Sequence, residues 1–314
     1  MRNNDQSPIV VSIVSLAYNH AKYIRQCLDG FIMQKTTFAF EVLIHDDAST
    51  DGTADIIREY ELKYPNIIKP IYQTENQYQK GVAIGATYLY PRVQGKYIAE
   101  CEGDDYWTDP LKLQKQIDLL EKHPECSFCC GGYIQRQEGL LDLDIVITKS
   151  SSPFYIFTKK DLANKWFTMP LTIVYRSDLL HKYIELTSKC RYTRDAHLVY
   201  SLLDSGNGIY LSEKLAVYNV HLGGISSMKS PYTRVVNAYN CYKELYLCTK
   251  DSILKKVYFD NIALRIRSIE EKQINELLKE GLILSPKHWY NLFIAVIIHY
   301  TKRIISRFTN KPIF

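Results

Sequence analysis

The chain of 314 residues lacks several features that would assign it to a common class of protein. It has no uninterrupted run of about 20 apolar residues, which is the length that a membrane-spanning helix needs. It contains neither GxGxxG nor GxxxxGK[ST], and the spacing of Gly81 and Gly85 fits neither phosphate-loop motif. The apolar stretch Ile9–Ala17 is broken by serines and precedes no small-residue cleavage site, so we expect a strand there rather than a signal peptide.

Acidic residues are also missing at the end of the sequence, after Glu280. The five basic residues in that stretch account for the whole net charge of +5, which leaves 34 basic and 34 acidic residues before it. A nucleic-acid-binding body would carry a basic face on its folded domain, so we expect no nucleic-acid partner. The five basic residues are Lys287, Lys302, Arg303, Arg307 and Lys311.

Residues 286–314 contain the apolar run Trp289–Ile298, which is too short to cross a bilayer. Its aromatic start and cationic end predict a helix that lies on an anionic membrane surface. The alternative is a helix that docks on the body of the protein with its basic end in water. Both interpretations stay open on the sequence alone.

The eight cysteines are scattered along the chain and form no disulfide framework. Cys126 and Cys129 have the CxxC spacing of zinc ligands, but no second ligand pair lies nearby. We therefore expect reduced and mostly buried thiols, as in a cytoplasmic protein.

The first half of the sequence predicts an alternation of strands and helices. Ile9–Leu16 is the apolar run of a strand buried on both faces, and Phe40–His45, Ile67–Tyr72 and Tyr97–Cys101 have a similar character. Apolar residues recur at helical spacing between these runs. The alternation is typical of a largely parallel α/β sheet.

The second half has a less regular pattern. Asp109 and Pro110 are residue types that favour the start of a helix, so we expect one to begin there. Leu171–Tyr175 has the composition of a further strand. Long helical stretches without strands follow residue 230. We therefore divide the chain into an α/β domain, residues 1–230, and a helical region, residues 231–314.

Three acidic features stand out. Asp46 and Asp47 close the second strand, and Glu102–Asp105 follows the fourth. The ligand crevice of an open α/β sheet lies at the carboxyl ends of its strands, so these two groups are expected at one edge. Asp51 is explained as a cap of the next helix, and Asp195, at the start of a later helix, would by itself also be read as an N-cap.

The segment 102–105 places three carboxylates in four residues. A solvated acidic turn is one explanation. Burying such a cluster is costly unless a cation or hydrogen-bond donors compensate. Hard oxygen ligands of this kind suit Mg²⁺ or Mn²⁺, which bridge to phosphate oxygens. Gly103 would let a ligand approach the backbone closely.

The order of these features resembles glycosyltransferase family 2, over roughly residues 8 to 225. The resemblance implies a GT-A fold, a Rossmann-like and mostly parallel central sheet flanked by helices, here with a C-terminal helical extension. Two positions depart from the family's usual pattern: Ala48 stands where glycine is usual, and Glu102 where aspartate is commoner. The three segments that carry the resemblance are Val11–Asn19, Leu43–Thr53 and Tyr97–Asp105.

The resemblance also implies a nucleotide site. Tyr18 would stack on a uracil ring, and the backbone around Leu16 would line it. Asp47 would accept the hydrogen of uracil N3, and Asp104 would reach the ribose. Lys80 is the candidate basic residue near the diphosphate.

The same resemblance assigns the reacting groups. Asp105 would hold a divalent metal, Mn²⁺ or Mg²⁺, against the diphosphate. His221 would approach the metal or the diphosphate, or else act as a hydrogen-bonding residue of its loop. Asp195 would be the catalytic base, although Arg194 replaces the acidic residue that usually precedes it. The sequence offers Asp195 as one base and no second carboxylate paired with it. This favours a single displacement with inversion over glycoside hydrolysis, which needs two carboxylates.

We therefore expect an inverting, metal-dependent hexosyl- or N-acetylhexosaminyl-transferase that uses a UDP-sugar. Its acceptor would be a hydroxyl of a glycan or a lipid-linked glycan in bacterial surface-polysaccharide or glycoconjugate assembly. We expect it in the cytoplasm at the inner face of the membrane, with peripheral contact through residues 286–314. The alternatives are a nucleotidyltransferase and a non-catalytic relative that binds nucleotide-sugars.

Overall fold

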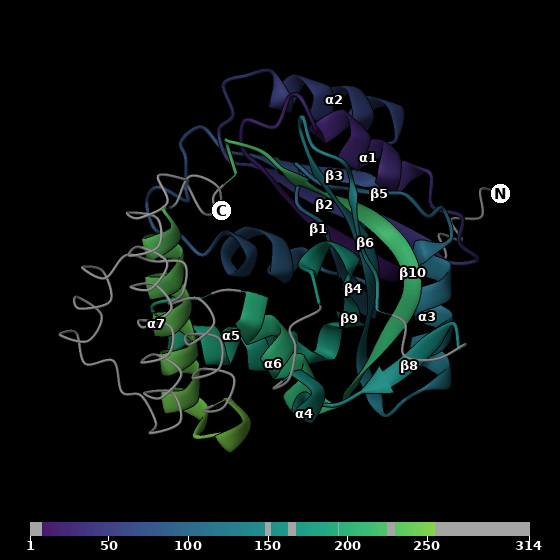
Figure 1. Ribbon diagram of the computed structural model, residues 1–314. Coiled ribbons are helices and arrows are strands. Elements are labelled where there is room, and N and C mark those ends of the chain that lie inside the picture. Colours follow the sequence, from purple (N-terminus) through teal and green to yellow (C-terminus); the bar gives the residue numbers. More distant parts are fainter. Residues whose placement is uncertain (1–7, 148–151, 163–167, 194, 225–229, 255–314) are drawn as a thin grey trace, which may run out of the picture. The chain divides into compact units, whose positions relative to one another are not determined.

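The structure is a computed structural model that describes residues 8–147, 152–162, 168–193, 195–224 and 230–254 (Figure 1). The chain forms two compact units. The first comprises Met1–Asp161, Lys165–Leu186 and His197–His221, and the second comprises Leu162–Asn164, Thr187–Ala196 and Leu222–Phe314. The division into residues 1–230 and 231–314 stays a prediction.

The amino-terminal half of the sheet has the predicted parallel arrangement. Strands β1 (Ile9–Ala17), β2 (Ala39–Asp46), β3 (Ile68–Tyr72) and β4 (Tyr97–Glu100) lie in the order β3-β2-β1-β4, and each adjacent pair is parallel. Val11, Ile13, Val42 and Ile44 are fully buried, in agreement with strands covered on both faces. The carboxyl ends of β1, β2 and β4 therefore meet at one edge, as predicted for the acidic segments.

The rest of the sheet is mixed. The order continues β4-β9-β6-β10-β5, with β6 (Cys126–Gln137) parallel to β10 (Asn207–Val220). The short strands are all antiparallel to their partners, so this half is not the simple parallel pattern of the first. They are β5 (Tyr106–Trp107), β7 (Leu143–Ile145), β8 (Phe154–Phe157) and β9 (Val174–Arg176).

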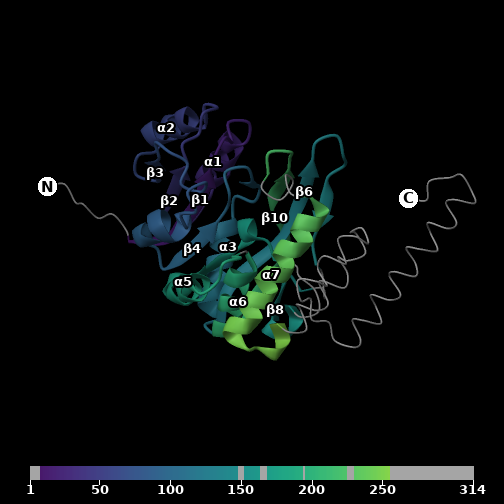
Figure 2. The same cartoon turned by 90° about the vertical axis from the view of Figure 1, so that its left-hand side faces the viewer.

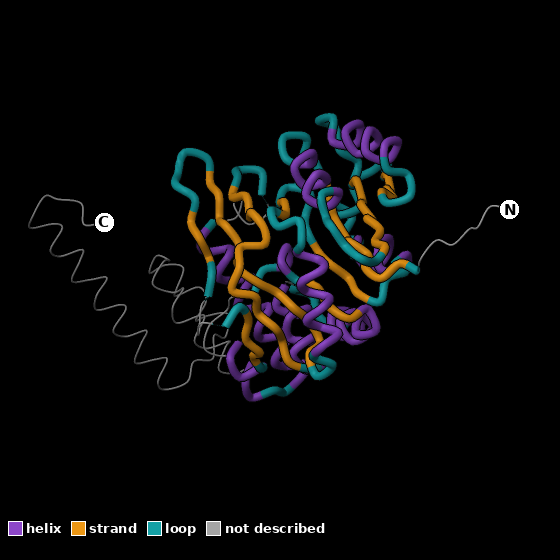
Figure 3. Tube along the Cα trace, turned by 90° about the vertical axis from the view of Figure 1, so that its right-hand side faces the viewer, coloured by secondary structure: helices purple, strands orange, loops and turns teal. Residues whose placement is uncertain are grey.

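In the first unit, helices lie against the strands (Figure 3). The described α-helices are α1 (Ile24–Ile32), α2 (Thr53–Lys63), α3 (Lys112–Lys122), α4 (Lys159–Leu162), α5 (Leu180–Ser188), α6 (Asp195–Ser205) and α7 (Pro231–Thr249). A π-helical turn occupies Gly85–Leu89, and 3₁₀ turns occupy Tyr90–Arg92, Pro170–Thr172 and Ser177–Leu179. None of the helices in the described ranges is long and apolar enough to cross a membrane. The predicted interfacial segment, residues 286–314, lies outside these ranges.

Two local predictions were wrong in detail. The expected strand Leu171–Tyr175 is a 3₁₀ turn at Pro170–Thr172 followed by β9, because Pro170 begins a turn instead of continuing a ladder. Asp109 does not cap a helix that starts at once. Its Oδ1 accepts the backbone N–H of Leu111 at 2.9 Å, and α3 begins at Lys112 after this turn.

Trp107 anchors the loop that carries the acidic residues. Its ring packs edge-on against Phe31 of α1 with centroids 4.9 Å apart, and its indole N–H donates to the carbonyl of Leu171 at 2.8 Å. A Cβ at Gly30 would lie 2.9 Å from the backbone nitrogen of Trp107, so α1 approaches β5 as closely as only glycine allows. These contacts fix the position of Asp105, two residues before the tryptophan.

Candidate active site

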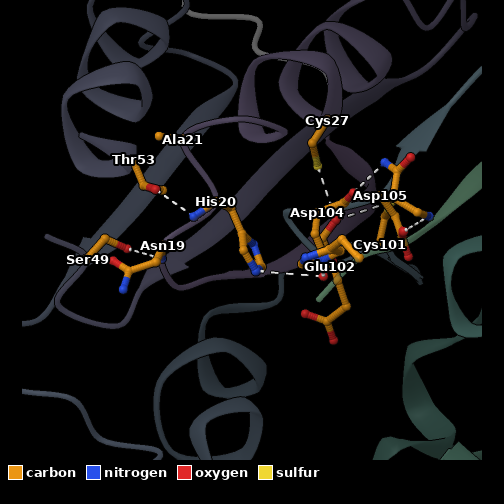
Figure 4. Close-up of polar contacts among 12 residues, drawn as sticks. Asn19, His20, Ala21, Cys27, Ser49, Thr53, Cys101, Glu102, Asp104 and Asp105 are labelled. Carbon is orange, nitrogen blue, oxygen red and sulfur yellow. Dashed lines mark hydrogen bonds and ion pairs between the residues drawn. The ribbon is translucent and has the colours of Figure 1, made fainter. Parts of the chain in front are cut away.

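Glu102–Asp105 follows β4, in the middle of the strand order, and leads to β5, the last strand of that order. Figure 4 labels Glu102, Asp104 and Asp105. The N–H of Gly103 donates to the carbonyl of Leu16 at 2.8 Å, which ties this loop to the end of β1. A Cβ at Gly103 would lie 3.0 Å from that carbonyl and 3.0 Å from Nδ1 of His20. A side chain here would force these neighbours to shift by a few tenths of an ångström, so close packing favours glycine. Leu16 contributes to the site through its backbone.

Asp105 is a carboxylate almost removed from water, with 5 % of its surface exposed. Its Oδ1 accepts the backbone N–H of Asn219 at 2.8 Å, and the Asn219 side-chain amide donates to the carbonyl of Asp104 at 2.6 Å. Burial, and next the charge of Asp104, raise the pKa of Asp105 well above its usual range, although the Asn219 N–H opposes this. The ionised form of Asp105 therefore needs a positive charge nearby.

Asp104 is the meeting point of two histidines. Its Oδ2 lies 3.0 Å from Nε2 of His221 and 3.7 Å from Nε2 of His20. His221 also packs against the ring of Tyr23, with centroids 4.6 Å apart. Burial lowers the pKa of His20, and the Asp104 carboxylate opposes that shift. Nδ1 of His20 is buried and has no hydrogen-bond partner within the described residues.

The loops that follow β1 and β2 are joined by hydrogen bonds from backbone to side chain. The N–H of Asn19 donates to Oγ of Ser49 at 2.9 Å, and the N–H of Ala21 donates to Oδ2 of Asp51 at 3.0 Å. Tyr18, just before these contacts, keeps 40 % of its surface exposed. Its ring is thus accessible for the stacking role that the resemblance implies.

Asp47 is buried at the carboxyl end of β2, with 3 % of its surface exposed. Its Oδ1 accepts the N–H of Gln77 at 2.7 Å, and its Oδ2 accepts the N–H of Tyr78 at 3.0 Å. The carboxylate thus holds the segment that follows β3. Each oxygen can accept a second hydrogen bond, so this structural role is compatible with the predicted contact to a uracil N3.

The turn after β2 contains Ala48, and its backbone shows why glycine is usual at this position. Ala48 has φ +60°, in the left-handed region where glycine has no steric penalty. The N-cap residue of α2 is Gly52 and not Asp51 as predicted, but Asp51 precedes it and its Oδ1 accepts the N–H of Thr53, the first residue of α2, at 3.0 Å. The acidic turn is therefore only partly explained by capping, since Asp47 makes different contacts.

Two further predicted residues, Lys80 and Asp195, lie in other segments of the chain. Lys80 forms an ion pair with Glu75 on the surface. Asp195 is the exposed first residue of α6 and belongs to the second compact unit. The roles of Lys80 near a diphosphate and of Asp195 as a base stay predictions.

The sequence did not single out His20 or Asn219. His20 follows the predicted nucleotide loop directly, and Asn219 lies two positions before His221 at the end of β10. Both residues lie near the end of a strand, and this position was the signal in the sequence that could have marked them as candidate site residues. Their contacts with Asp104 and Asp105, which join distant parts of the sequence, depend on the fold.

Comparison with known proteins decides the family. Residues 12–184, more than half of the chain, match the family model described as Glycosyl transferase family 2. The chain belongs to this family. The match begins in β1 and ends in α5, so it includes Asp47, Asp104 and Asp105 but stops before Asp195.

Two relatives extend the comparison of this family 2 chain. TuaG of Bacillus subtilis, whose name assigns it to teichuronic acid biosynthesis, is 30 % identical over 221 residues, or 70 % of this chain and 82 % of TuaG. WfaP of Escherichia coli, named a UDP-Glc:alpha-D-GlcNAc-diphosphoundecaprenol beta-1,3-glucosyltransferase, is 36 % identical over 139 residues, or 44 % of this chain and 49 % of WfaP. The chain spans about a third of the length of uncharacterized mycobacterial relatives to which it is 50 % identical over 119 residues.

The fold is shared with solved structures. S. aureus TarS in complex with UDP-GlcNAc superposes with a TM-score of 0.61 at 16 % identity, over 91 % of this chain and 79 % of the TarS chain. This likeness, with the observed sheet, confirms the predicted GT-A fold.

Proposed function

We propose that this chain transfers a sugar from a UDP-sugar to a hydroxyl of a lipid-linked glycan. The observation that carries the proposal is the pair Asp104–Asp105 at the end of β4. One of these carboxylates is buried with a raised pKa, and the other faces two histidines. An acidic pair with one buried carboxylate, at the carboxyl edge of an α/β sheet, is suited to a cation that accompanies a diphosphate.

Support for a UDP-sugar donor comes from the loops after β1 and β2. Tyr18 offers an accessible ring, and Asp47 retains lone pairs that could accept a hydrogen from uracil N3. The TarS complex contains UDP-GlcNAc, and the name of WfaP specifies UDP-Glc. The donated sugar would accordingly be a hexose or an N-acetylhexosamine.

The residues at this edge fit a divalent metal, Mn²⁺ or Mg²⁺. The part of the chain that the structure describes has no group of three His, Cys, Asp or Glu side chains that could hold a metal ion by themselves. These ions are, however, usually bound by one or two carboxylates together with substrate phosphates. Asp105 would hold the ion, with His221 or Asp104 beside it. When bound, the ion would stabilise the negative charge of the diphosphate leaving group.

Asp195 is proposed as the base that takes the proton of the acceptor hydroxyl as the oxygen attacks the anomeric carbon. A single displacement with one base inverts the anomeric centre. The name of TuaG assigns it to teichuronic acid biosynthesis, and the name of WfaP includes GlcNAc-diphosphoundecaprenol. We propose a similar setting for this chain, in the cytoplasm at the inner face of the membrane.

The test is a panel of UDP-sugars in which release of UDP is measured with and without Mn²⁺ or Mg²⁺. We expect metal-dependent release by the wild type. Asp105→Asn and Asp195→Asn should each lower the rate by about 100-fold or more, as for loss of an electrostatic or base contribution. Asp118→Asn is the control, because Asp118 is exposed on α3. Full activity in both site variants would show that the site assignment is wrong.

The same assay separates the alternatives. With pyrophosphate added, a nucleotidyltransferase would convert the UDP-sugar and pyrophosphate to UTP and a sugar 1-phosphate instead of releasing UDP. Metal-dependent binding of UDP without turnover of any donor would indicate a non-catalytic member of the family.

A further inference from the structure

The turn between β6 and β7, residues 138–142, has a fixed shape. The N–H of Leu140 donates to the carbonyl of Gln137 at 3.0 Å, and Gly139 takes the φ of +80° that this tight turn requires. Arg136 then binds Asp142 through two hydrogen bonds, Nε to Oδ1 at 3.0 Å and Nη2 to Oδ2 at 2.7 Å. The ion pair between Arg136 and Asp142 closes the turn, and residues 137–141 form a compact loop between them.

The turn exposes three leucines between its charged residues. Leu140 has 64 % of its surface exposed and Leu141 has 95 %, and Leu143, at the start of β7, has 54 %. Single exposed leucines are ordinary on protein surfaces, whereas several together mark an interaction site.

The carboxylates around these leucines all have basic partners. Asp142 is bound by Arg136, Glu138 lies 3.1 Å from Nζ of Lys22, and Asp144 lies 3.0 Å from Nζ of Lys214. The turn therefore presents leucine side chains with locally balanced charge. Balanced charge lowers the electrostatic cost of approaching a low-dielectric surface.

The turn is tied to the candidate active site. Arg136 pairs with Asn219 in the β6–β10 register, and Asn219 holds Asp105 and the backbone of Asp104. Nη1 of Arg136 also donates to the hydroxyl of Tyr106, the residue after Asp105, at 2.7 Å.

In the strand order, β6 and β10 lie on one side of β4, and β1 and β2 lie on the other. The β6–β7 turn follows the end of β6, which is labelled in Figure 2. The ion pair between Lys22 and Glu138 joins the turn to the loop after β1. The turn therefore borders the proposed nucleotide loops as well as the carboxylate site.

We propose that the β6–β7 turn inserts Leu140 and Leu141 into the lipid surface that presents the acceptor. This inference rests on the proposed function, since it gives a lipid-linked acceptor a place of contact. A lipid surface fits better than a protein partner, because stable protein interfaces bury about 800 Å² on each side and this apolar tip is only a few side chains wide. The name of WfaP, which includes diphosphoundecaprenol, points to the same class of acceptor.

The first test compares full-length wild type with the double variant Leu140→Asn, Leu141→Asn in flotation with neutral phosphatidylcholine vesicles. Neutral lipid removes the electrostatic attraction of the basic tail. We expect at least about a tenfold fall in vesicle binding, because two leucines lose their apolar burial. Leu62→Asn is the matched control, since Leu62 of α2 is 83 % exposed. Equal binding by the double variant and the wild type would overturn the inference.

The second test locates the contact directly. Leu141→Trp should be quenched by brominated phosphatidylcholine, and Leu62→Trp should not. Absence of quenching at position 141, or concentration-dependent self-association that the double variant abolishes without any vesicle binding, would also overturn the inference. UDP release in solution, measured on the same samples, keeps the two proposals apart. If release fails while quenching at position 141 persists, the proposed function is wrong and the lipid contact stands.

Discussion

Lys112 lies in the interior of the first unit, where its side chain is fully buried. Its ammonium donates to Oε1 of Gln116 at 2.8 Å and lies 4.0 Å from the centroid of the Trp107 ring. Burial lowers the pKa of Lys112 from 10.5 to about 7, against smaller opposing effects of Cys101 and other neighbours. The Trp107 ring favours the charged form and offsets part of the cost of burying it. The side chain therefore links the stability of the core to pH.

The sign of that link follows from proton binding. Between pH 7 and 10.5 the unfolded chain binds a proton at Lys112 that the folded chain has lost, so Lys112 makes stability rise with pH in this window. The full effect is about 5 kcal/mol, and the slope is at most about 1.4 kcal/mol per pH unit. Below pH 7 the folded protein bears the full cost of the buried charge.

We predict that Lys112→Met removes this slope. The free energy of unfolding of the variant minus that of the wild type should fall as the pH rises from 7 to 9, because only the wild type gains stability from deprotonation of Lys112. Urea unfolding at three pH values measures this difference, and contributions from the cysteines largely cancel in it. Parallel stability curves for the two proteins would show that Lys112 does not titrate in this range.

At the scale of elements, hydrogen bonds to Asp47 fix the position of residues 76–78, in the segment between β3 and β4. The hydrogen bonds from the N–H groups of Gln77 and Tyr78 converge on its carboxylate, and the side chain of Asn76 donates to its carbonyl at 3.3 Å. These contacts attach the segment to the carboxyl end of β2. A change at Asp47 should therefore affect a whole loop as well as a nucleotide contact.

We predict that Asp47→Asn exposes this loop and weakens the preference for uridine. The new amide group cannot accept one of the two N–H bonds, so deuterium exchange should speed up in peptides that cover residues 76–80. Affinity for UDP should fall by about tenfold, and the preference for UDP over CDP should shrink, because loss of a hydrogen bond to a buried charge costs about 1.5–3 kcal/mol.

Asp55→Asn, on the exposed face of α2, provides the comparison. Faster exchange with an unchanged UDP preference would leave Asp47 with a structural role alone. Unchanged exchange would contradict the loop assignment.

Much of the first half of the fold could be predicted because its signals are local. Strands β1, β2 and β4 are buried on both faces and are nearly continuous apolar runs, and acidic residues follow β2 and β4 directly. Parallel pairing alone predicted that Asp47 and the loop after β4 would both lie at the carboxyl end of β1. The N–H groups of Asp47 and Gly103 donate to the carbonyls of Ala17 and Leu16, respectively.

Other features could not be predicted, because they depend on contacts between distant segments. The contact of Asn219 with Asp105 requires the long β6–β10 pairing, and the position of His20 beside Asp104 requires the close approach at Gly103. The start of α3 also shifted, because the side chain of Asp109 bonds a turn before the helix. No local pattern encodes the register between distant strands.

At the scale of the whole molecule, two different kinds of membrane contact are proposed. The β6–β7 turn is apolar and its charges are paired. Residues 286–314 contain five basic residues and no acidic one, and they lie outside the described residues. Membrane binding through the turn should therefore occur with neutral as well as anionic lipid. Membrane binding through the tail should require anionic lipid and should weaken as salt is added.

We predict that a chain ending at residue 285 loses binding to vesicles that contain phosphatidylserine. Each Lys or Arg near an anionic surface contributes about 1 kcal/mol, so the loss should be tenfold or more at low salt and should shrink as salt is added. Sedimentation with vesicles at two salt concentrations measures it. Replacing the five basic residues of the full-length chain with glutamine should reproduce most of the loss, because the apolar run is then intact. If the shortened chain binds as well as the full-length protein, the tail is not the electrostatic contact, and the interpretation of a helix docked on the body is favoured instead.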